Sequence, residues 1–354
     1  MDRPPVGQCS NSTERRGSVA VVSENDIKQF LAKAGWGQAD RSGLAGDASN
    51  RRYERLELNS TRRILMIVPP DKDDNIRSFV HITNILRSRC LSAPEIYAED
   101  ANRGLVLIED LGDDLFARLA KDSETEAQMY SAAVGLLPTL ADINDVTNIP
   151  PYDMATYQRE ARLILDWYIP SATGRPADAE AEAEFPDLIA AACAPARTGT
   201  LVLRDYHAEN LLWLPNREGH QKVGLLDYQD AMMGDAAYDL VSLLEDARRD
   251  VSKNLQDSEI KHYLALTGDT EADFLRRYAA LGAQRNIKIV GIFARLCVRD
   301  GKARYPDFIP RVWLYLQQDL QHPALERLAN WLARHVPVPT SAIIAAVKAG
   351  KNAA

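Results

Sequence analysis

Three oxygen-bearing side chains, Asp205, Asn210 and Asp227, lie beside short apolar runs in one stretch of the sequence. Asp205 and Asp227 each follow such a run, and Asn210, five residues after Asp205, precedes another. If the last two runs pair as a hairpin, all three side chains come to the same edge of a small sheet. Phosphoryl transfer needs such a set, because one carboxylate orients or deprotonates the attacking hydroxyl and hard oxygen ligands hold Mg²⁺ against the phosphates.

We therefore predict that Asp205 is the catalytic base or orienter, and that Asn210 and Asp227 are metal ligands. Asp and Asn also favour turns, so any one of the three alone could cap a loop or end a hairpin. Their joint occurrence at the ends of apolar strands favours the catalytic interpretation.

The pattern of elements around these residues divides the chain into two parts. A capped helix is expected to begin at Ser23, and strands are expected within residues 43–70, 94–97 and 105–108, with a helix at 75–89 between them. The remainder has helical periodicity except at residues 200–226, where strands flank a turn. The predicted fold class is α+β and bilobal, with a small β-rich N-lobe and a larger helical C-lobe that carries an inserted catalytic hairpin.

The expected domains are a disordered arm (1–22), a nucleotide-binding N-lobe (23–112), a catalytic and substrate-binding C-lobe (113–340) and a frayed tail (341–354). The arm mixes Pro, Gly, Ser and Arg, a composition typical of disorder. A cleft between two such lobes is a natural place for a ligand.

Composition argues against several classes of protein. The 354-residue chain has a net charge of −8 and no basic cluster, so nothing is concentrated to bind a nucleic-acid backbone. No apolar run approaches the ~20 residues that span a bilayer, and the first 22 residues hold no secretory signal. The 4 cysteines are scattered, which suits a reducing compartment. We expect a cytoplasmic protein with a small-molecule substrate, and the sequence leaves its oligomeric state open.

The spacing of Asp205, Asn210 and Asp227 resembles that of the eukaryotic-like kinase superfamily. With the segments Arg204–Asp205–Tyr206–His207–Ala208–Glu209–Asn210 and Gly234–Asp235–Ala236–Ala237–Tyr238–Asp239–Leu240, it is similar to the aminoglycoside phosphotransferase and choline kinase-like family. Residues 46–53, 64–66, 109–113 and 226–231 resemble the bacterial cell-wall sugar kinases of that family. The resemblance covers about residues 23–335. It implies a protein-kinase-like fold and ATP- and Mg²⁺-dependent phosphorylation of the anomeric hydroxyl of N-acetylmuramate or N-acetylglucosamine in peptidoglycan recycling.

The resemblance also implies a turn that covers the nucleotide phosphates, formed by Gly46, Asp47, Ala48 and Ser49. Small residues let backbone N–H groups approach an anion closely, although a plain hairpin turn is the alternative. A second segment, Glu109, Asp110 and Leu111, would be the hinge whose backbone groups hydrogen-bond adenine. A connector without ligand contact is the alternative there.

The sequence departs from the kinase pattern at one cation. The third strand usually carries a Lys that grips the phosphates and pairs with a Glu on the next helix. Met66 occupies the expected Lys position, and residues 75–89 contain no Glu. Another cation must then neutralise the phosphates, and Arg51 or Arg52 is our hypothesis. The two alternate in direction along the strand, so only one can face the nucleotide.

Several other polar residues have two interpretations each. Asp239 resembles the helix-borne carboxylate that supports the catalytic loop through its backbone. His207 could position Asp205 or touch the substrate, or be satisfied by nearby backbone. Gln229 and Asp230 could reach a sugar hydroxyl or a second Mg²⁺, or face solvent.

Basic residues on the predicted helices of the larger lobe, among them Arg285, Lys288, Arg295 and Arg299, have a plain interpretation as solvated charges. Arg295 and Arg299 share a helix face and could instead meet a carboxylate such as a lactyl group.

Two alternatives to a cell-wall sugar kinase stay open. The acceptor could be an aminoglycoside, choline or homoserine. The chain could also be a catalytically decayed, nucleotide-binding regulatory protein, although the presence of Asp205, Asn210 and Asp227 argues against decay. No Walker A or G-x-S-x-G motif occurs, so neither P-loop nor serine-hydrolase chemistry is supported. ATP rather than GTP is an assumption.

Overall fold

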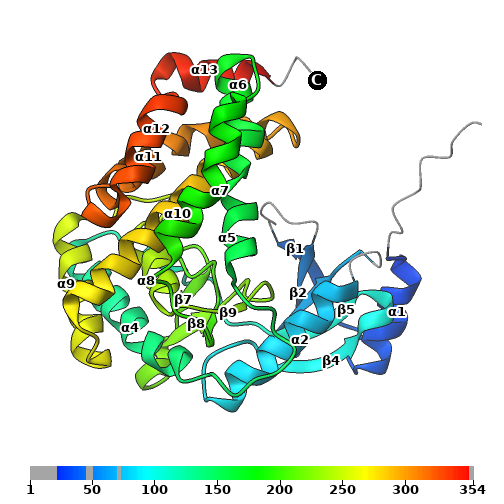
Figure 1. The fold of residues 1–354 in the computed structure, drawn as a ribbon. Coiled ribbons are helices and arrows are strands. Elements are labelled where there is room, and N and C mark those ends of the chain that lie inside the picture. The colour runs from blue at the N-terminus through cyan, green and yellow to red at the C-terminus, as the bar shows by residue number, and fades with distance from the viewer. Residues whose placement is uncertain (1–21, 45–50, 70–72, 351–354) are drawn as a thin grey trace, which may run out of the picture. The chain divides into compact units, whose positions relative to one another are not determined.

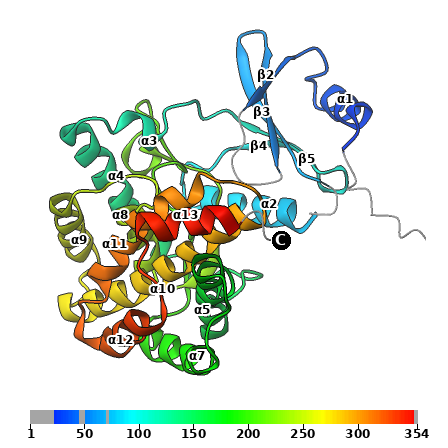
Figure 2. The ribbon, with the colours of Figure 1, turned by 90° about the horizontal axis from the view of Figure 1, so that it is seen from above.

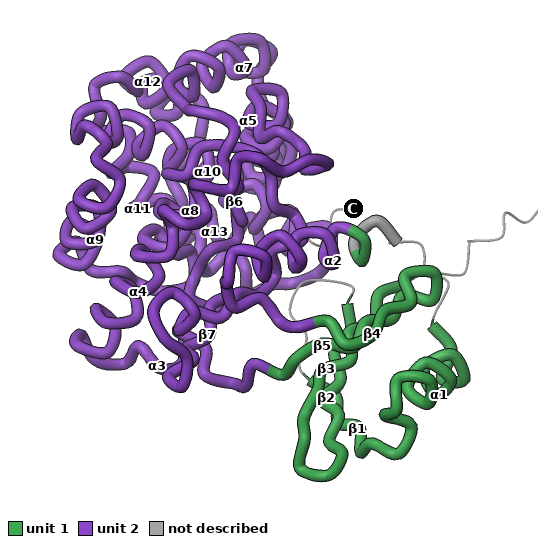
Figure 3. The backbone as a smooth tube through the Cα atoms, turned by 90° about the horizontal axis from the view of Figure 1, so that it is seen from below, with its two compact units in different colours: residues 1–77, 96–110 green, residues 78–95, 111–354 purple. Residues whose placement is uncertain are grey.

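The computed structural model describes residues 22–44, 51–69 and 73–350, and the chain divides into two compact units (Figure 3). Unit 1 comprises Met1–Arg77 and Ile96–Asp110, and unit 2 comprises Ser78–Glu95 and Leu111–Ala354. The expected lobe boundary is at residue 112, and the chain passes from unit 1 to unit 2 for the last time between Asp110 and Leu111. Residues 78–95, which we had expected in the small lobe, belong to the larger unit. The arm expected at residues 1–22 lies outside the described residues apart from Val22.

Unit 1 is built on a five-stranded antiparallel sheet of order β1-β2-β3-β5-β4. Its elements are α1 (Glu24–Lys33), β1 (Asp40–Leu44), β2 (Arg52–Leu58), β3 (Thr61–Ile67), β4 (Ile96–Asp100), η2 (Ala101–Arg103) and β5 (Leu105–Glu109). The side chain of Ser23 accepts a hydrogen bond from the Asp26 N–H, so the predicted helix cap is confirmed. Apolar residues of α1 pack with Leu56, Leu65 and Leu107 on one face of the sheet, which leaves the opposite face for other contacts.

Unit 2 is mostly helical and is organised around α10 (Glu271–Val298), a 28-residue helix that packs against α5, α7, α8, α11 and α13 (Figures 1 and 2). The helices that precede α10 are α3 (Phe116–Leu119), α4 (Ser123–Ala141), α5 (Met154–Ala161), η3 (Ile164–Tyr168), α6 (Ile169–Thr173), α7 (Ala179–Cys193), η4 (Gly219–Lys222), α8 (Ala237–Leu244) and α9 (Lys253–Thr267). Those that follow it are η5 (Tyr305–Phe308), α11 (Ile309–Asp319), η6 (Pro323–Leu325), α12 (Glu326–His335) and α13 (Ser341–Ala349).

Two short β-ribbons are inserted among these helices. The predicted hairpin is present as β7 (Leu211–Trp213) paired with β8 (Val223–Leu225). The second ribbon pairs β6 (Thr200–Val202) with β9 (Met232–Gly234). The sequence did not indicate β9, because a three-residue strand is too short to show an alternating pattern. The predicted α+β class, with a small sheet unit and a larger helical unit carrying a hairpin, is confirmed.

The C-terminal half of α2 (Asp73–Ser88) and the segment after it are anchored to the ribbons of unit 2. The ring of Phe79 stacks on Tyr228 at a centroid distance of 5.4 Å, and the Thr83 hydroxyl lies 2.7 Å from the Tyr228 hydroxyl. Further along, the Leu225 N–H donates to the Ser92 carbonyl at 3.0 Å. These contacts join residues 78–95 to unit 2, and no pattern in the sequence shows them.

The expected frayed tail at residues 341–354 is wrong for most of its length. Residues Ser341–Ala349 form α13, which begins with a hydrogen bond from the Ile343 N–H to the Thr340 hydroxyl. Ile344 and Val347 are buried, and the helix packs against α6 and α10 (Figure 2). Burial of this apolar stripe stabilises the helix. The sequence did not suggest the helix, because the segment lies near the end of the chain and is preceded by prolines. Among the described residues, no helix has the length and apolar character needed to cross a membrane.

Candidate active site

The loop between β6 and β7 presents Asp205, and two residues of α8 hold that loop. The Asp239 carboxylate accepts hydrogen bonds from the backbone N–H groups of Leu203 (2.7 Å) and Arg204 (2.8 Å). The Ser242 hydroxyl donates to the Arg204 carbonyl at 3.0 Å. Arg204 has φ +72°, a left-handed conformation that a non-glycine residue adopts only where its surroundings enforce it. Three hydrogen bonds from α8 therefore fix the backbone immediately before Asp205.

The side chain of Arg204 reinforces this arrangement. Its guanidinium forms an ion pair with Glu160 of α5 and donates to the Asp230 carbonyl at 3.1 Å. Glu160 also accepts from Tyr152 and pairs with Lys288 of α10 at 3.2 Å. The loop is thus held from α5 and α10 as well as from α8.

Short backbone and side-chain contacts connect the predicted catalytic residue, Asp205, with the segments that carry the predicted metal ligands Asn210 and Asp227. The Asn210 side-chain amide donates to the Asp205 carbonyl at 3.0 Å, and the Leu226 N–H, one residue before Asp227, donates to the Asn210 carbonyl at 3.0 Å. Asp227 has φ +55°, so the chain turns sharply where β8 ends. The hairpin therefore brings Asn210 and Asp227 to the end of the ribbon at which the Asp205 loop arrives.

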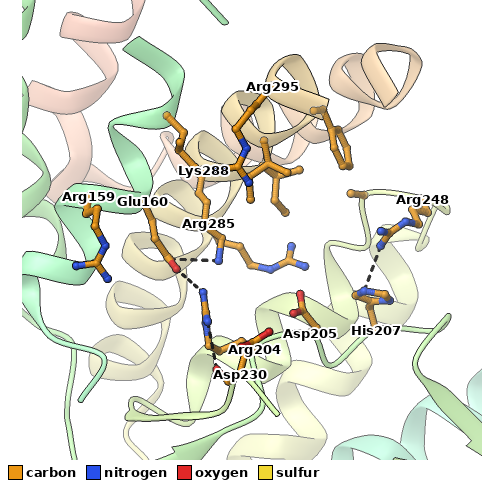
Figure 4. Close-up of a pocket in the computed structure, with 15 residues that line it drawn as sticks. Arg159, Glu160, Arg204, Asp205, His207, Asp230, Arg248, Arg285, Lys288 and Arg295 are labelled. Carbon is orange, nitrogen blue, oxygen red and sulfur yellow. Dashed lines mark hydrogen bonds and ion pairs between the residues drawn. The ribbon is translucent and has the colours of Figure 1, made fainter. Parts of the chain in front are cut away.

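A cavity of about 430 Å³ opens beside Asp205, and every residue that lines it belongs to unit 2 (Figure 4). Its basic side chains come chiefly from α5 and α10, and Ile289, Ile292, Phe293 and Leu163 supply apolar surface. The charged lining comprises six basic side chains and three carboxylates: Arg159, Arg204, Arg248, Arg285, Lys288 and Arg295, with Glu160, Asp205 and Asp230. The cavity is cationic.

Asp205 is exposed to the cavity although protein atoms surround it densely. Burial alone would raise its pKa, but His207, Lys288, Arg204 and Arg285 lower the pKa below its ordinary value. Burial also lowers the pKa of His207 to about 4, so the imidazole is neutral at pH 7. The Lys288 ammonium and the two guanidinium groups are therefore the cations that keep Asp205 ionised at neutral pH.

The buried His207 ring has a defined tautomer in this structure. Its Nε2 atom lies 3.1 Å from Nη1 of Arg248 and 3.4 Å from Nδ2 of Asn210, and both of these groups are donors. Nε2 is then the acceptor, and the proton is on Nδ1, which is buried without a hydrogen-bond partner. The His207 ring contacts two other side chains and lines the cavity, so it is placed to orient Asn210 or to touch a ligand.

Gln229 and Asp230 have different surroundings. Gln229 is buried, and its amide nitrogen donates to the carboxylates of Asp227 and Asp230, both at 3.1 Å. Asp230 is exposed and lines the cavity. Gln229 is therefore placed to hold two carboxylates, and only Asp230 is placed to meet a ligand in the cavity.

The strand register of unit 1 separates Arg51 from Arg52. Arg52 lies on the α1 face of the sheet and pairs with Glu54 at 3.3 Å. Tyr53 is the cross-strand partner of Met66, and alternation along the strand puts Arg51 on their face. Met66 is buried there. The predicted phosphate turn of Gly46, Asp47, Ala48 and Ser49 lies outside the described residues.

In the predicted hinge, the chain passes from unit 1 to unit 2 between Asp110 and Leu111. The Asp110 carboxylate forms a two-point ion pair with Arg55, at 2.7 Å and 3.1 Å. That side chain is committed to the sheet of unit 1, which is consistent with any hinge contact of Glu109, Asp110 and Leu111 being made by backbone groups.

Sequence reasoning missed Glu160 and misjudged Arg285 and Lys288. The two basic residues are buried, with exposures of 4% and 7%, so the interpretation as solvated helix charges is wrong for them. A signal was present, because both interrupt a largely apolar stretch of α10. Glu160 carried no comparable signal, since it lies in a short polar helix.

Comparisons with known proteins identify the family of the chain. A model of the phosphotransferase enzyme family matches residues 40–281, and the chain belongs to that family. Over 349 residues it is 39% identical to an N-acetylmuramate/N-acetylglucosamine kinase of Caulobacter vibrioides, covering 88% of this chain and 96% of that protein.

Solved structures show the same fold at low sequence identity. A choline/ethanolamine kinase family protein of Mesorhizobium loti superposes with a TM-score of 0.60 at 13% identity, covering 92% of this chain and 99% of that one. APH(2″)-IIa, in a ternary complex with streptomycin and ATP, superposes with a TM-score of 0.55 at 14% identity, covering 85% and 97%. The fold of this chain is therefore that of the small-molecule kinases.

Beneath the cavity, Glu245 and Asp319 form a buried acidic pair. The Asn286 amide donates to Glu245 at 2.7 Å and to Asp319 at 3.0 Å, and the Glu245 carbonyl accepts from Arg285 at 3.2 Å. Burial is the main cause that raises the pKa of both carboxyl groups. The folded protein therefore keeps protons on this pair at pH values where the unfolded chain has lost them.

This pair should make the protein less stable as the pH rises. Where the native state binds more protons than the unfolded state, the free energy of unfolding falls with pH, by about 1.4 kcal/mol per pH unit for each extra proton. We expect a decline that begins above the ordinary carboxyl pKa values and continues through neutral pH. Denaturant unfolding of Asp319→Asn should show a flatter profile, while the exposed Asp300→Asn should follow the native profile. Identical profiles for Asp319→Asn and the native protein would contradict the role of the pair.

Proposed function

We propose that this chain transfers the γ-phosphoryl group of ATP to the anomeric hydroxyl of N-acetylmuramate or N-acetylglucosamine. The observation that carries the proposal is that Asp205 lines a cavity of about 430 Å³ among basic side chains and is hydrogen-bonded through its backbone carbonyl to Asn210. Such a volume is typical of small-molecule sites. The substrate class is supported by the name of the Caulobacter vibrioides relative, and ATP by the related fold solved with that nucleotide.

The proposed mechanism gives Asp205 the task of orienting the acceptor hydroxyl and accepting its proton. Its lowered pKa favours the ionised form that this task needs, and Lys288 and Arg285 maintain that form. The loop hydrogen bonds from Asp239 and Ser242 keep the carboxylate in place before the acceptor arrives, which reduces the ordering required in the transition state.

The donor set of Asn210 and Asp227 fits Mg²⁺. No group of three or more His, Cys, Asp or Glu side chains that could hold a metal occurs among the described residues. That finding agrees with Mg²⁺, which is commonly held by one or two protein oxygens together with substrate phosphates and water. When bound, the ion would neutralise phosphate charge, and Gln229 would keep the Asp227 carboxylate in position through its 3.1 Å hydrogen bond.

The charge of the cavity bears on the alternative acceptors. Choline and aminoglycosides are cations, and six basic side chains against three carboxylates would repel them. A neutral or anionic sugar is compatible with the same lining. A decayed regulatory protein would have no use for an ionised Asp205 on a loop whose preceding residues form three hydrogen bonds with α8.

Purified protein should convert N-acetylmuramate or N-acetylglucosamine, with ATP and Mg²⁺, to a product whose ³¹P spectrum is that of an anomeric phosphate. Asp205→Asn should lower turnover by roughly 10²–10⁴-fold, because it removes the proton acceptor. Asp257→Asn, at an exposed ion pair on α9, is the matched control and should keep full turnover. Phosphate on another hydroxyl, or an Asp205→Asn enzyme of native turnover, would refute the proposal.

For the missing strand cation, we propose that Arg51 and not Arg52 contacts the nucleotide phosphates. Arg51 shares a sheet face with Met66, at the position where related kinases carry Lys, whereas Arg52 pairs with Glu54 on the α1 face. Arg51→Gln should raise the KM for ATP roughly tenfold or more, as loss of a charge-assisted hydrogen bond does. Arg52→Gln should leave that KM unaltered, and an equal effect of the two substitutions would exclude the assignment.

A further inference from the structure

We infer that Arg295 binds a carboxylate of the acceptor, so that the cavity distinguishes an acidic amino sugar such as N-acetylmuramate from the neutral N-acetylglucosamine. The inference rests on the proposed function and adds the residue that would determine its specificity. Figure 4 shows Arg295 at the end of the cavity opposite Arg204 and Asp230, with its side chain directed along α10 toward Lys288.

Most cations of the cavity already have partners within the protein. Arg204 and Lys288 share the carboxylate of Glu160, and Arg248 pairs with Glu209 at 2.9 Å. Arg285 donates to the Ser242 hydroxyl at 2.9 Å and to the Glu245 carbonyl at 3.2 Å. These groups are held in place and provide a fixed positive field.

Arg295 differs from them. Within the described parts of the chain it has no ion pair closer than 4 Å, whereas its buried Nε atom without a hydrogen-bond partner is a feature that it shares with Arg204. Burial, with the nearby charge of Arg299, lowers the pKa of the guanidinium. A guanidinium favours a carboxylate that accepts from two of its nitrogens, and a ligand carboxylate in the cavity could accept from the terminal nitrogens of Arg295.

Arg295 and Asp205 line the same cavity, so one ligand could contact both. Arg285, Lys288, Ile292 and Arg295 recur at helical spacing along one face of α10, and all line the cavity. Side chains on a helix tilt toward its N-terminus, so Arg295 reaches back along α10 toward Lys288.

The proposed acceptor has the matching chemistry. In N-acetylmuramate the lactyl carboxylate is attached at the ring carbon two positions from the anomeric carbon, so its charge lies away from the hydroxyl at Asp205. Ile289, Ile292 and Phe293 offer apolar surface to the cavity. N-acetylglucosamine lacks the carboxylate and would leave Arg295 without a partner.

The neighbouring Arg299 provides a matched control. It lies one helical turn beyond Arg295, is exposed, and pairs with Asp300 at 2.6 Å. It does not line the cavity. The sequence offers the same two interpretations for both arginines, but only Arg295 lines the cavity.

Steady-state kinetics of Arg295→Gln with both sugars test the inference. The ratio of kcat/KM for N-acetylmuramate to that for N-acetylglucosamine should fall roughly 10- to 100-fold, mainly through the KM for N-acetylmuramate. Arg295→Lys should restore part of the ratio, because Lys keeps the charge without the planar fork. Arg299→Gln should keep the native ratio.

Two results would overturn the inference while the proposed function stands. The first is an equal loss for both sugars with a native unfolding transition, since Arg295 would then act on the phosphoryl group or on the cavity as a whole. The second is a native protein that phosphorylates N-acetylglucosamine and an Arg295→Gln protein whose ratio of kcat/KM for the two sugars equals the native ratio. A native protein that phosphorylates neither sugar would remove the proposed function itself and the inference with it.

Discussion

The hydrogen bonds that the Asp239 carboxylate accepts from the backbone N–H groups of Leu203 and Arg204 are the constraint on which the site depends. They hold Arg204 in a left-handed conformation, which directs Asp205 toward the cavity. Burial raises the pKa of Asp239 to about 7, while the two N–H donors favour its charged form. The helix that carries Asp239 thereby holds the loop in a strained backbone conformation, and such strain is typical of functional sites.

A second consequence concerns charge. Arg204, once fixed, pairs with Glu160, and Glu160 also binds Lys288 of α10. Buried charges are costly unless paired, so this one carboxylate allows two cations to remain beside Asp205. The result is a cavity whose positive field keeps Asp205 ionised. In the proposed function the same few side chains would serve both catalysis and discrimination against cationic acceptors.

Sequence patterns were sufficient for the fold class, the β7–β8 hairpin and the spacing of Asp205, Asn210 and Asp227, because each leaves a local signal of apolar runs and turn residues. Glu160 and Arg285 could not be assigned in this way, since their surroundings come from helices far apart in the chain. The same holds for α13, whose Val347 is buried only by packing against the rest of unit 2. Local patterns predict elements well, and they do not predict which element covers another.

The central claim is that Asp205, Asn210 and Asp227 serve one phosphoryl-transfer centre. The most direct measurement is a crystal structure with Mn²⁺, a non-hydrolysable ATP analogue and the amino sugar, in which anomalous scattering locates the cation. We predict a peak bound by the Asn210 amide oxygen and the Asp227 carboxylate, with the anomeric hydroxyl in hydrogen-bond contact with Asp205. A cation held by other residues, or a sugar whose anomeric hydroxyl faces away from Asp205, would contradict the account.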